Sequence, residues 1–126
     1  MATVGVIGLG YVGLPLAVAF AEADCDVIAV DVDSRRVEAV QAGESHVEDV
    51  PDRVLQALGE RILATTRYAE LERADAVLIC VPTPLSRNRE PDLGPLIDAT
   101  RSLSRVLRSE QLVVLESTTF GVVRIV

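Results

Sequence analysis

The feature that most constrains this chain is a regular alternation of apolar runs of strand length with segments of helical periodicity. Parallel strands joined by crossover helices give this pattern, because the helices bury both faces of the sheet. The alternation predicts an α/β fold in a single domain, with a doubly wound parallel sheet of five to six strands. The expected strands are Thr3–Ile7, Asp26–Val30, Ile62–Thr66, Ala76–Val81 and Leu112–Leu115.

Helical segments fill the intervals between these strands. They are expected over Tyr11–Ala23, from Asp33 or Ser34 up to Gly43, over residues 54–58, and from Pro95 onward. Gly43 stands where a C′ glycine ends a helix, and Asp33 or Ser34 can cap the same helix at its start. The core face of the last helix is expected to contain Leu96, Ala99, Leu103, Val106 and Leu107.

A glycine motif links the first strand to the first helix. Gly8-Leu9-Gly10-Tyr11-Val12-Gly13 is a G-x-G-x-x-G, weak evidence alone but stronger directly after a strand and at the start of a helix. Gly8 permits the tight turn, Gly10 leaves room for a pyrophosphate, and Gly13 lets the helix pack closely on the strand. Free N–H groups at the helix start can bind the phosphates. The motif predicts a Rossmann-type dinucleotide site.

An acidic residue decides which dinucleotide is favoured. Asp31 ends the second strand eighteen residues after Gly13, where a carboxylate accepts both hydroxyls of an adenosine ribose and repels a 2′-phosphate. Arg35 and Arg36 follow closely, and an arginine there can accommodate that phosphate. We expect the repulsion to dominate, so NAD is the predicted cofactor, and the arginines either flank the ribose or lie on a solvated helix face.

Hydroxyl groups follow the fourth and fifth strands. Pro82-Thr83-Pro84 and Ser117-Thr118-Thr119 lie at carboxyl ends of strands, where open α/β sheets bind ligands. They can reach a nicotinamide ribose, although Ser-Thr-Thr after a strand is more often turn chemistry.

Composition excludes several classes of partner. With 19 acidic and 12 basic residues the formal charge is -7, which argues against nucleic acid. All basic residues are arginine, so no lysine amine is available. Cys25 and Cys80 lack the spacing of a metal site or a disulfide framework and are interpreted as structural, so no metal is expected. Without a membrane-span run or a signal peptide, we expect a cytoplasmic protein with no membrane partner.

Several separated motifs together resemble the UDP-glucose/GDP-mannose dehydrogenase family, over residues 3 to about 121. They are G-L-G-Y-V-G followed by Leu14-Pro15, A-D-A-V-L-I-C-V-P-T-P at 74–84, P-D-L at 91–93, and L-E-S-T-T at 115–119. The resemblance implies an NAD-dependent UDP-sugar 6-dehydrogenase, which oxidises a C6 alcohol to a carboxylate with two NAD in polysaccharide biosynthesis. A nucleotide sugar is then the partner, bound through a further domain. Residues 43–50, G-E-S-H-V-E-D-V, resemble members acting on UDP-N-acetylhexosamines, and His46 within them is interpreted as an exposed structural residue.

The resemblance also implies roles for individual residues. The positions that match NAD contacts of the family are Gly10, Tyr11, Val12, Asp31, Arg36, Thr83 and Thr118. With the residues assigned above, the candidate cofactor site is Gly8, Gly10, Tyr11, Val12, Gly13, Asp31, Arg36, Pro82, Thr83, Ser117 and Thr118. Thr118 is also the candidate catalytic residue, because it matches a threonine beside the reacting carbon. The family's nucleophilic cysteine, its lysine and its asparagine belong to downstream motifs.

The sequence after Thr119 departs from the family pattern, which continues to Pro-Gly-Thr. We therefore expect residues 1–126 to be an NAD-binding Rossmann domain, C-terminally truncated, without the substrate domain and inactive alone. A stand-alone dinucleotide-sensing module and a fragment of a β-hydroxyacid-type dehydrogenase remain alternatives. Truncation would leave Leu112–Leu115 at an open apolar edge, which favours a homo-oligomer, with the β-branched residues of 122–126 forming a short extra strand or packing across a two-fold axis.

Overall fold

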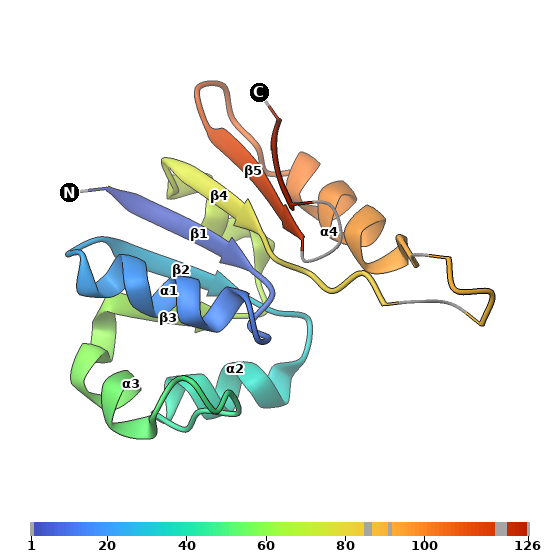
Figure 1. Cartoon of the computed structure of the whole chain (residues 1–126). Coiled ribbons are helices and arrows are strands. Elements are labelled where there is room, and N and C mark those ends of the chain that lie inside the picture. Colours follow the sequence, from blue (N-terminus) through green and yellow to red (C-terminus); the bar gives the residue numbers. More distant parts are fainter. Residues whose placement is uncertain (1, 85–86, 91, 118–120, 126) are drawn as a thin grey trace.

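The computed structural model describes residues 2–84, 87–90, 92–117 and 121–125. Its centre is a six-stranded sheet in the order β3-β2-β1-β4-β5-β6 (Figure 1). The strands are β1 (Thr3–Ile7), β2 (Asp26–Val30), β3 (Ile62–Thr65), β4 (Ala76–Ile79), β5 (Leu112–Ser117) and β6 (Gly121–Ile125). The first five are parallel, and Val6 of β1 lies in register between Ala29 of β2 and Leu78 of β4. The predicted doubly wound Rossmann-type fold is confirmed.

Helices occupy the connections that the sequence pattern indicated. They are α1 (Gly13–Glu22), α2 (Ser34–Gln41), α3 (Asp52–Leu58) and α4 (Gly94–Ser104), with two 3-10 helices, η1 (Gly59–Arg61) and η2 (Tyr68–Arg73). The Asp33 side chain caps α2 by accepting the Arg35 N–H at 3.0 Å. Gly43 ends this helix with a φ of 78°, and its N–H donates to the Val40 carbonyl at 3.0 Å. Both predicted ends of the helix are confirmed.

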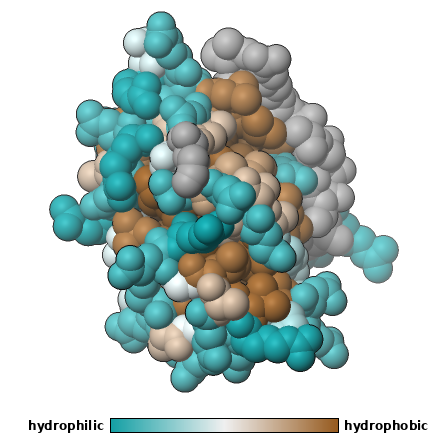
Figure 2. Space-filling view, turned by 90° about the vertical axis from the view of Figure 1, so that its left-hand side faces the viewer, coloured by the Kyte–Doolittle hydropathy of each residue, from teal (hydrophilic) through white to brown (hydrophobic). Residues whose placement is uncertain are grey.

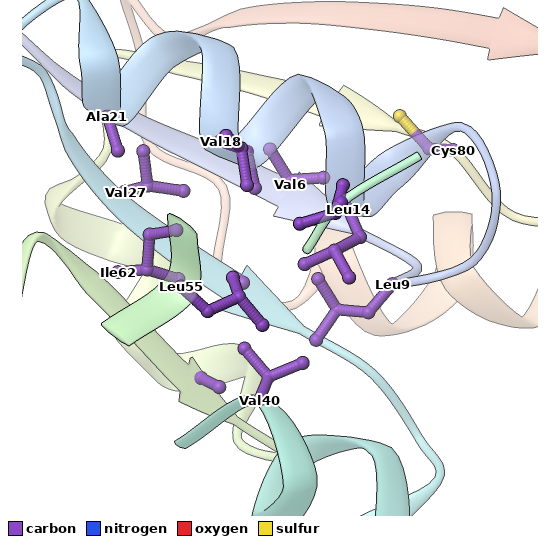
Figure 3. Close-up of a cluster of buried hydrophobic side chains, with 14 of the residues drawn as sticks. Val6, Leu9, Leu14, Val18, Ala21, Val27, Val40, Leu55, Ile62 and Cys80 are labelled. Carbon is purple, nitrogen blue, oxygen red and sulfur yellow. The ribbon is translucent and has the colours of Figure 1, made fainter. Parts of the chain in front are cut away.

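The helices cover the sheet from both sides and form two apolar cores. Side chains from α1, α2 and α3 pack on one face, where Leu14 is fully buried between the helix and the sheet (Figure 3). On the other face, Leu71 of η2 and Leu103 of α4 pack against alternate residues of the same strands. Each buried side chain of this size contributes about 1.5–3 kcal/mol relative to its exposed state. Burial on both faces explains why the strands are continuous apolar runs.

The last helix departs from the prediction at its end. Ala99 and Leu103 are buried and Leu96 and Val106 are half-buried, as expected. Leu107, however, is 42% exposed, so its assignment to the core was wrong. The helix ends at Ser104, so Leu107 continues the apolar period of the sequence but lies beyond the helix that this period predicted.

The expected open edge at Leu112–Leu115 is also wrong. β6 pairs with β5 in antiparallel orientation, with Leu115 opposite Val123, so the chain supplies its own outer strand. Of the two arrangements expected for residues 122–126, the extra strand is the one observed for the described part. Association of the chain with itself stays a prediction and needs a contact other than this edge.

Figure 2 shows the side of the molecule that lies on the left in Figure 1, where the parallel strands begin. Apolar patches are interspersed there with hydrophilic side chains, so this face is neither uniformly polar nor uniformly apolar. The carboxyl ends of the strands, where open α/β sheets bind ligands, lie on the opposite side of the sheet (Figure 1).

Candidate functional site

The glycine loop connects β1 to α1, and its first and last glycines are packed closely against neighbouring backbone. Gly8 has a φ of 98°, and a Cβ there would lie 2.8 Å from the Cys80 carbonyl oxygen. A Cβ on Gly13 would lie 1.6 Å from the carbonyl oxygen of Gly8. These two glycines therefore shape the turn and let the helix approach the strand, as the motif predicted.

Gly10 differs from its neighbours in the motif. A Cβ on Gly10 would meet only the Arg36 Nη1 atom, at 3.7 Å, so the protein itself does not require glycine there. Within the part of the chain that the structure describes, the N–H groups of Tyr11, Val12 and Gly13 find no acceptor. No side chain caps α1, and no acidic residue lies in its first turn. Space beside Gly10 and free N–H groups at a helix N-terminus together form a cradle for an anion.

Asp31 lies next to this cradle, at the end of β2. It is 7% exposed, and its carboxylate accepts the N–H groups of Leu9 at 2.8 Å and Asp33 at 2.9 Å. Each oxygen accepts one of these bonds, so lone pairs remain on both for a ligand hydroxyl. The carboxylate is thus held in one orientation by the backbone on either side of it.

The two arginines after Asp31 have different surroundings. The Arg35 side chain is 91% exposed and pairs with Asp33 at 3.7 Å, which matches a solvated helix face. Arg36 instead lies 3.9 Å from the Asp31 carboxylate and beside Gly10. Only Arg36 is placed to flank a ligand held by Asp31.

A cleft of about 840 Å³ opens at the carboxyl ends of the strands. The candidate residues that line it are Gly8, Gly10, Tyr11, Val12, Asp31, Arg36, Pro82 and Thr83. Gly13 lies beneath the loop, against Gly8, and is not part of the lining. Ser117 is the last residue of β5, and Thr118 lies outside the described residues. The fold thus gathers eight of the eleven candidates at one cleft.

The cleft also contains residues that sequence reasoning missed. They are Ile7, Val32, Asp33, Tyr68, Cys80, Val81, Pro95, Asp98, Ala99, Ser102 and Glu116, whereas Pro84, which also lines the cleft, belongs to the predicted Pro82-Thr83-Pro84 segment. Val32 is 83% exposed. Its position directly after Asp31, the acid that ends a strand, could have indicated from the sequence that it lines the cleft. The contributions of η2 and α4 had no local signal, because they depend on how distant elements pack.

Tyr68 and Asp98 line the cleft together with Asp31. Burial raises the pKa of Tyr68, and the charges of Asp31 and Asp98 raise it further. Asp31, which follows β2, and Asp98, on α4, thus both contribute to the electrostatic environment of the Tyr68 hydroxyl.

The two cysteines are free, and Cys80 is buried. Burial raises the pKa of the Cys80 thiol from 9.0 to about 12, and the nearby Glu116 charge adds to the effect. A thiol that stays protonated near neutral pH is a poor nucleophile. Cys80 therefore lies in the cleft as a packing residue, in agreement with its structural interpretation.

His46 is more than the exposed loop residue that the sequence suggested. Although His46 is exposed, its Nε2 atom hydrogen-bonds to the carbonyl oxygen of Leu9, within the glycine motif. Thirty-seven residues separate the two positions, so local sequence patterns gave no indication of this contact.

Comparisons with known proteins agree on one family. Residues 2–122 match the family model described as "UDP-glucose/GDP-mannose dehydrogenase family, NAD binding domain". UDP-N-acetyl-D-mannosamine dehydrogenase of Escherichia coli K12 is 44% identical over 120 residues, and NDP-N-acetyl-D-galactosaminuronic acid dehydrogenase of Ralstonia nicotianae is 42% identical over 118. These matches cover 93% and 92% of this chain but 28% and 27% of the relatives. The chain thus spans little more than a quarter of their length.

Solved structures give the same result. GDP-mannose dehydrogenase from Pseudomonas aeruginosa superposes with a TM-score of 0.85 at 31% identity, covering 91% of this chain and 28% of that one. UDP-D-ManNAc dehydrogenase from Pyrococcus horikoshii superposes with a TM-score of 0.85 at 36% identity, covering 92% of this chain and 28% of that one.

Among the described residues, no helix combines the length and apolar character needed to cross a membrane.

Proposed function

This chain belongs to the UDP-glucose/GDP-mannose dehydrogenase family. From that membership we propose that it is the NAD-binding domain of an enzyme that oxidises the C6 alcohol of a UDP-sugar to a carboxylate with two NAD. The chain carries the family's NAD binding domain, and NAD is its cofactor. Family membership also argues against the β-hydroxyacid alternative. The substrate and the complete reaction are part of the proposal, because the relatives are more than three times as long as this chain.

One observation carries the proposal: the cradle at Gly10. A Cβ on Gly10 would meet no clash, so the loop leaves room for a ligand there, and the next three N–H groups have no acceptor among the described residues. This arrangement fits a pyrophosphate, which needs close approach to the backbone and several donors. Asp31, at the end of the next strand, fits the hydroxyls of an adenosine ribose.

In the proposed site, the adenosine and nicotinamide parts of NAD lie over different halves of the sheet. The N–H groups of Tyr11 and Val12 bind the pyrophosphate, and Asp31 accepts from the adenosine ribose with Arg36 beside it. Pro82 and Thr83, after β4, lie on the side of the nicotinamide ribose, because a dinucleotide crosses the sheet where the strand order reverses. Gly8 and Gly13 act through the shape of the loop.

The carboxylate of Asp31 selects NAD over NADP. A 2′-phosphate would place a second anion against a buried carboxylate whose orientation two backbone N–H groups hold. Arg36, 3.9 Å from this carboxylate, offsets part of its charge but remains partly exposed to solvent. We expect the repulsion to outweigh the attraction of a single exposed arginine.

Bound NAD supplies the hydride acceptor for oxidation of the sugar. Ser117 and Thr118 are the proposed hydroxyl ligands on the nicotinamide side, and Thr118 is the proposed residue beside the reacting carbon, by resemblance to the family. The chain has no lysine, and neither of its cysteines matches the family's nucleophile. The proposal therefore places the nucleophilic thiol, the lysine and the asparagine outside residues 1–126, and this chain alone does not oxidise the sugar.

The proposed substrate class is the UDP-N-acetylhexosamines. Relatives above 40% identity are named for N-acetyl-mannosamine and N-acetyl-galactosaminuronic acid nucleotides. We further propose a role in polysaccharide biosynthesis in the cytoplasm, which the two free cysteines support because a reducing compartment keeps thiols free. A homo-oligomer remains part of the proposal.

Two measurements test this function. Calorimetry should detect NAD binding to the chain, with weaker binding of NADP. Absorbance at 340 nm should show no NADH from UDP-N-acetylmannosamine with the chain alone, and turnover with a chimera in which the chain replaces the matching residues of the Escherichia coli UDP-N-acetyl-D-mannosamine dehydrogenase. A chain that binds no NAD would contradict the cofactor assignment, and a folded chimera that binds NAD without oxidising any nucleotide sugar would support the stand-alone sensing alternative instead.

A further inference from the structure

We propose that His46 is a positioning residue for the cofactor loop: it fixes the Leu9 carbonyl so that the N–H groups after Gly10 are aligned before NAD binds. The inference rests on the proposed NAD site and adds a residue from a segment that the function did not yet explain. Its basis is the hydrogen bond between His46 Nε2 and the Leu9 carbonyl oxygen.

The peptide groups of Leu9 are held from two directions. The Leu9 N–H donates to the Asp31 carboxylate at 2.8 Å, and the Leu9 carbonyl accepts from His46. The Leu9 side chain is fully buried in the core between α1 and the sheet. Backbone and side chain of the residue between the first two glycines are therefore fixed together, which limits the freedom that glycine on either side would otherwise allow.

The loop that carries His46 is itself anchored on both sides. Before it, the Ser45 N–H donates to the Asp52 carboxylate at 2.8 Å, which ties the loop to the start of α3. After it, Val47 is 3% exposed and packs in the same core as Leu9. The Ser45 hydroxyl closes a turn around His46 by accepting the Val47 N–H at 3.0 Å. A side chain presented between two anchors can hold its partner in place.

The chemistry of the contact specifies the proton. A carbonyl oxygen only accepts, so His46 Nε2 must carry the hydrogen, and a neutral His46 must be the Nε2-protonated tautomer. A glutamine amide at this position can donate in the same way, whereas an alanine cannot. Loss of the donor frees the loop, and NAD then has to order the loop when it binds, which weakens affinity.

The affinity test compares His46→Ala and His46→Gln in the full chain. Calorimetry should show NAD binding weakened about three- to tenfold by alanine, the equivalent of one hydrogen bond, and restored to within about twofold by glutamine. Asp49→Ala is the control, because Asp49 lies in the same loop, is exposed, and its side chain has no partner among the described residues. Alanine that lowers the melting temperature but leaves NAD affinity unchanged would show a purely structural role and overturn the inference.

The tautomer test does not depend on any variant folding. His46 is the only histidine in the chain, so its ring ¹⁵N signals are unambiguous. At a pH where imidazole is neutral, they should report a proton on Nε2 and respond to NAD. A proton on Nδ1 would overturn the inference even if NAD binds, whereas a wild-type chain that binds no NAD would contradict the proposed function itself.

Discussion

Alanine at Gly10 and alanine at Gly13 should have opposite effects on stability, although the two positions are only three residues apart in the sequence. At Gly13 the new Cβ would lie 1.6 Å from the Gly8 carbonyl oxygen, inside any permitted contact. That oxygen cannot move easily, because the Gly8 N–H is bonded to the Val30 carbonyl at 2.7 Å. At Gly10 the new Cβ would meet only a flexible arginine end, at 3.7 Å.

The magnitudes follow from these contacts. Gly13→Ala forces α1 away from the strand by more than an ångström, which costs at least about 3 kcal/mol, the upper range for overpacked cores. In a chain of this length the melting temperature should fall by roughly 10 °C or more. Gly10→Ala should leave stability unchanged or raise it by about 0.4–1 kcal/mol, because alanine lowers the entropy of the unfolded chain.

Gly10→Ala should instead weaken NAD binding. The Gly10→Ala methyl group occupies the space beside the free N–H groups, so the pyrophosphate loses at least one charge-assisted hydrogen bond, about 1.5–3 kcal/mol or roughly 10- to 150-fold in affinity. Thermal melts of both variants without ligand, followed by calorimetry of Gly10→Ala with NAD, measure the two quantities. Wild-type affinity in Gly10→Ala, or wild-type stability in Gly13→Ala, would refute the assignment of ligand space to one glycine and packing to the other.

Two further outcomes are expected. Asp31→Ser should weaken NAD binding about tenfold or more and reduce the preference for NAD over NADP. If calorimetry shows equal losses of affinity for NAD and NADP, the assignment of Asp31 to the adenosine ribose is contradicted. Stability should fall between pH 9 and about pH 12, since the unfolded chain releases the Cys80 proton that the folded chain retains, and thermal melts of Cys80→Ala should show a smaller decline over this range.

Local sequence signals located the first half of the fold closely. β1 and β2 have the predicted bounds, because each is an apolar run that ends at a residue with a distinct task, Gly8 or Asp31. The glycine motif and the acid are local features, and the parallel sheet brings them together in any fold of this type. Prediction therefore succeeded where function and backbone geometry require particular residues at fixed spacing.

The remaining features depend on contacts between distant residues. An open edge was expected at β5, with residues 122–126 either forming an extra strand or packing across a two-fold axis, and only the pairing of β6 with β5 in the folded chain decides between these arrangements. Leu107 continues the apolar period of α4 beyond the point where the helix ends. Likewise, the bond from His46 to Leu9 and the position of Asp98 in the cleft follow from packing between elements that sequence periodicity does not relate.

The central claim is that the chain binds NAD through the N–H groups of its glycine loop, and amide NMR tests it most directly. In a titration of the ¹⁵N-labelled chain with NAD, the amide signals of Gly10, Tyr11, Val12 and Gly13 should shift most, together with that of Leu9, whose N–H is bonded to Asp31. Millimolar NAD that leaves these five signals in place, or shifts signals elsewhere instead, would contradict the account.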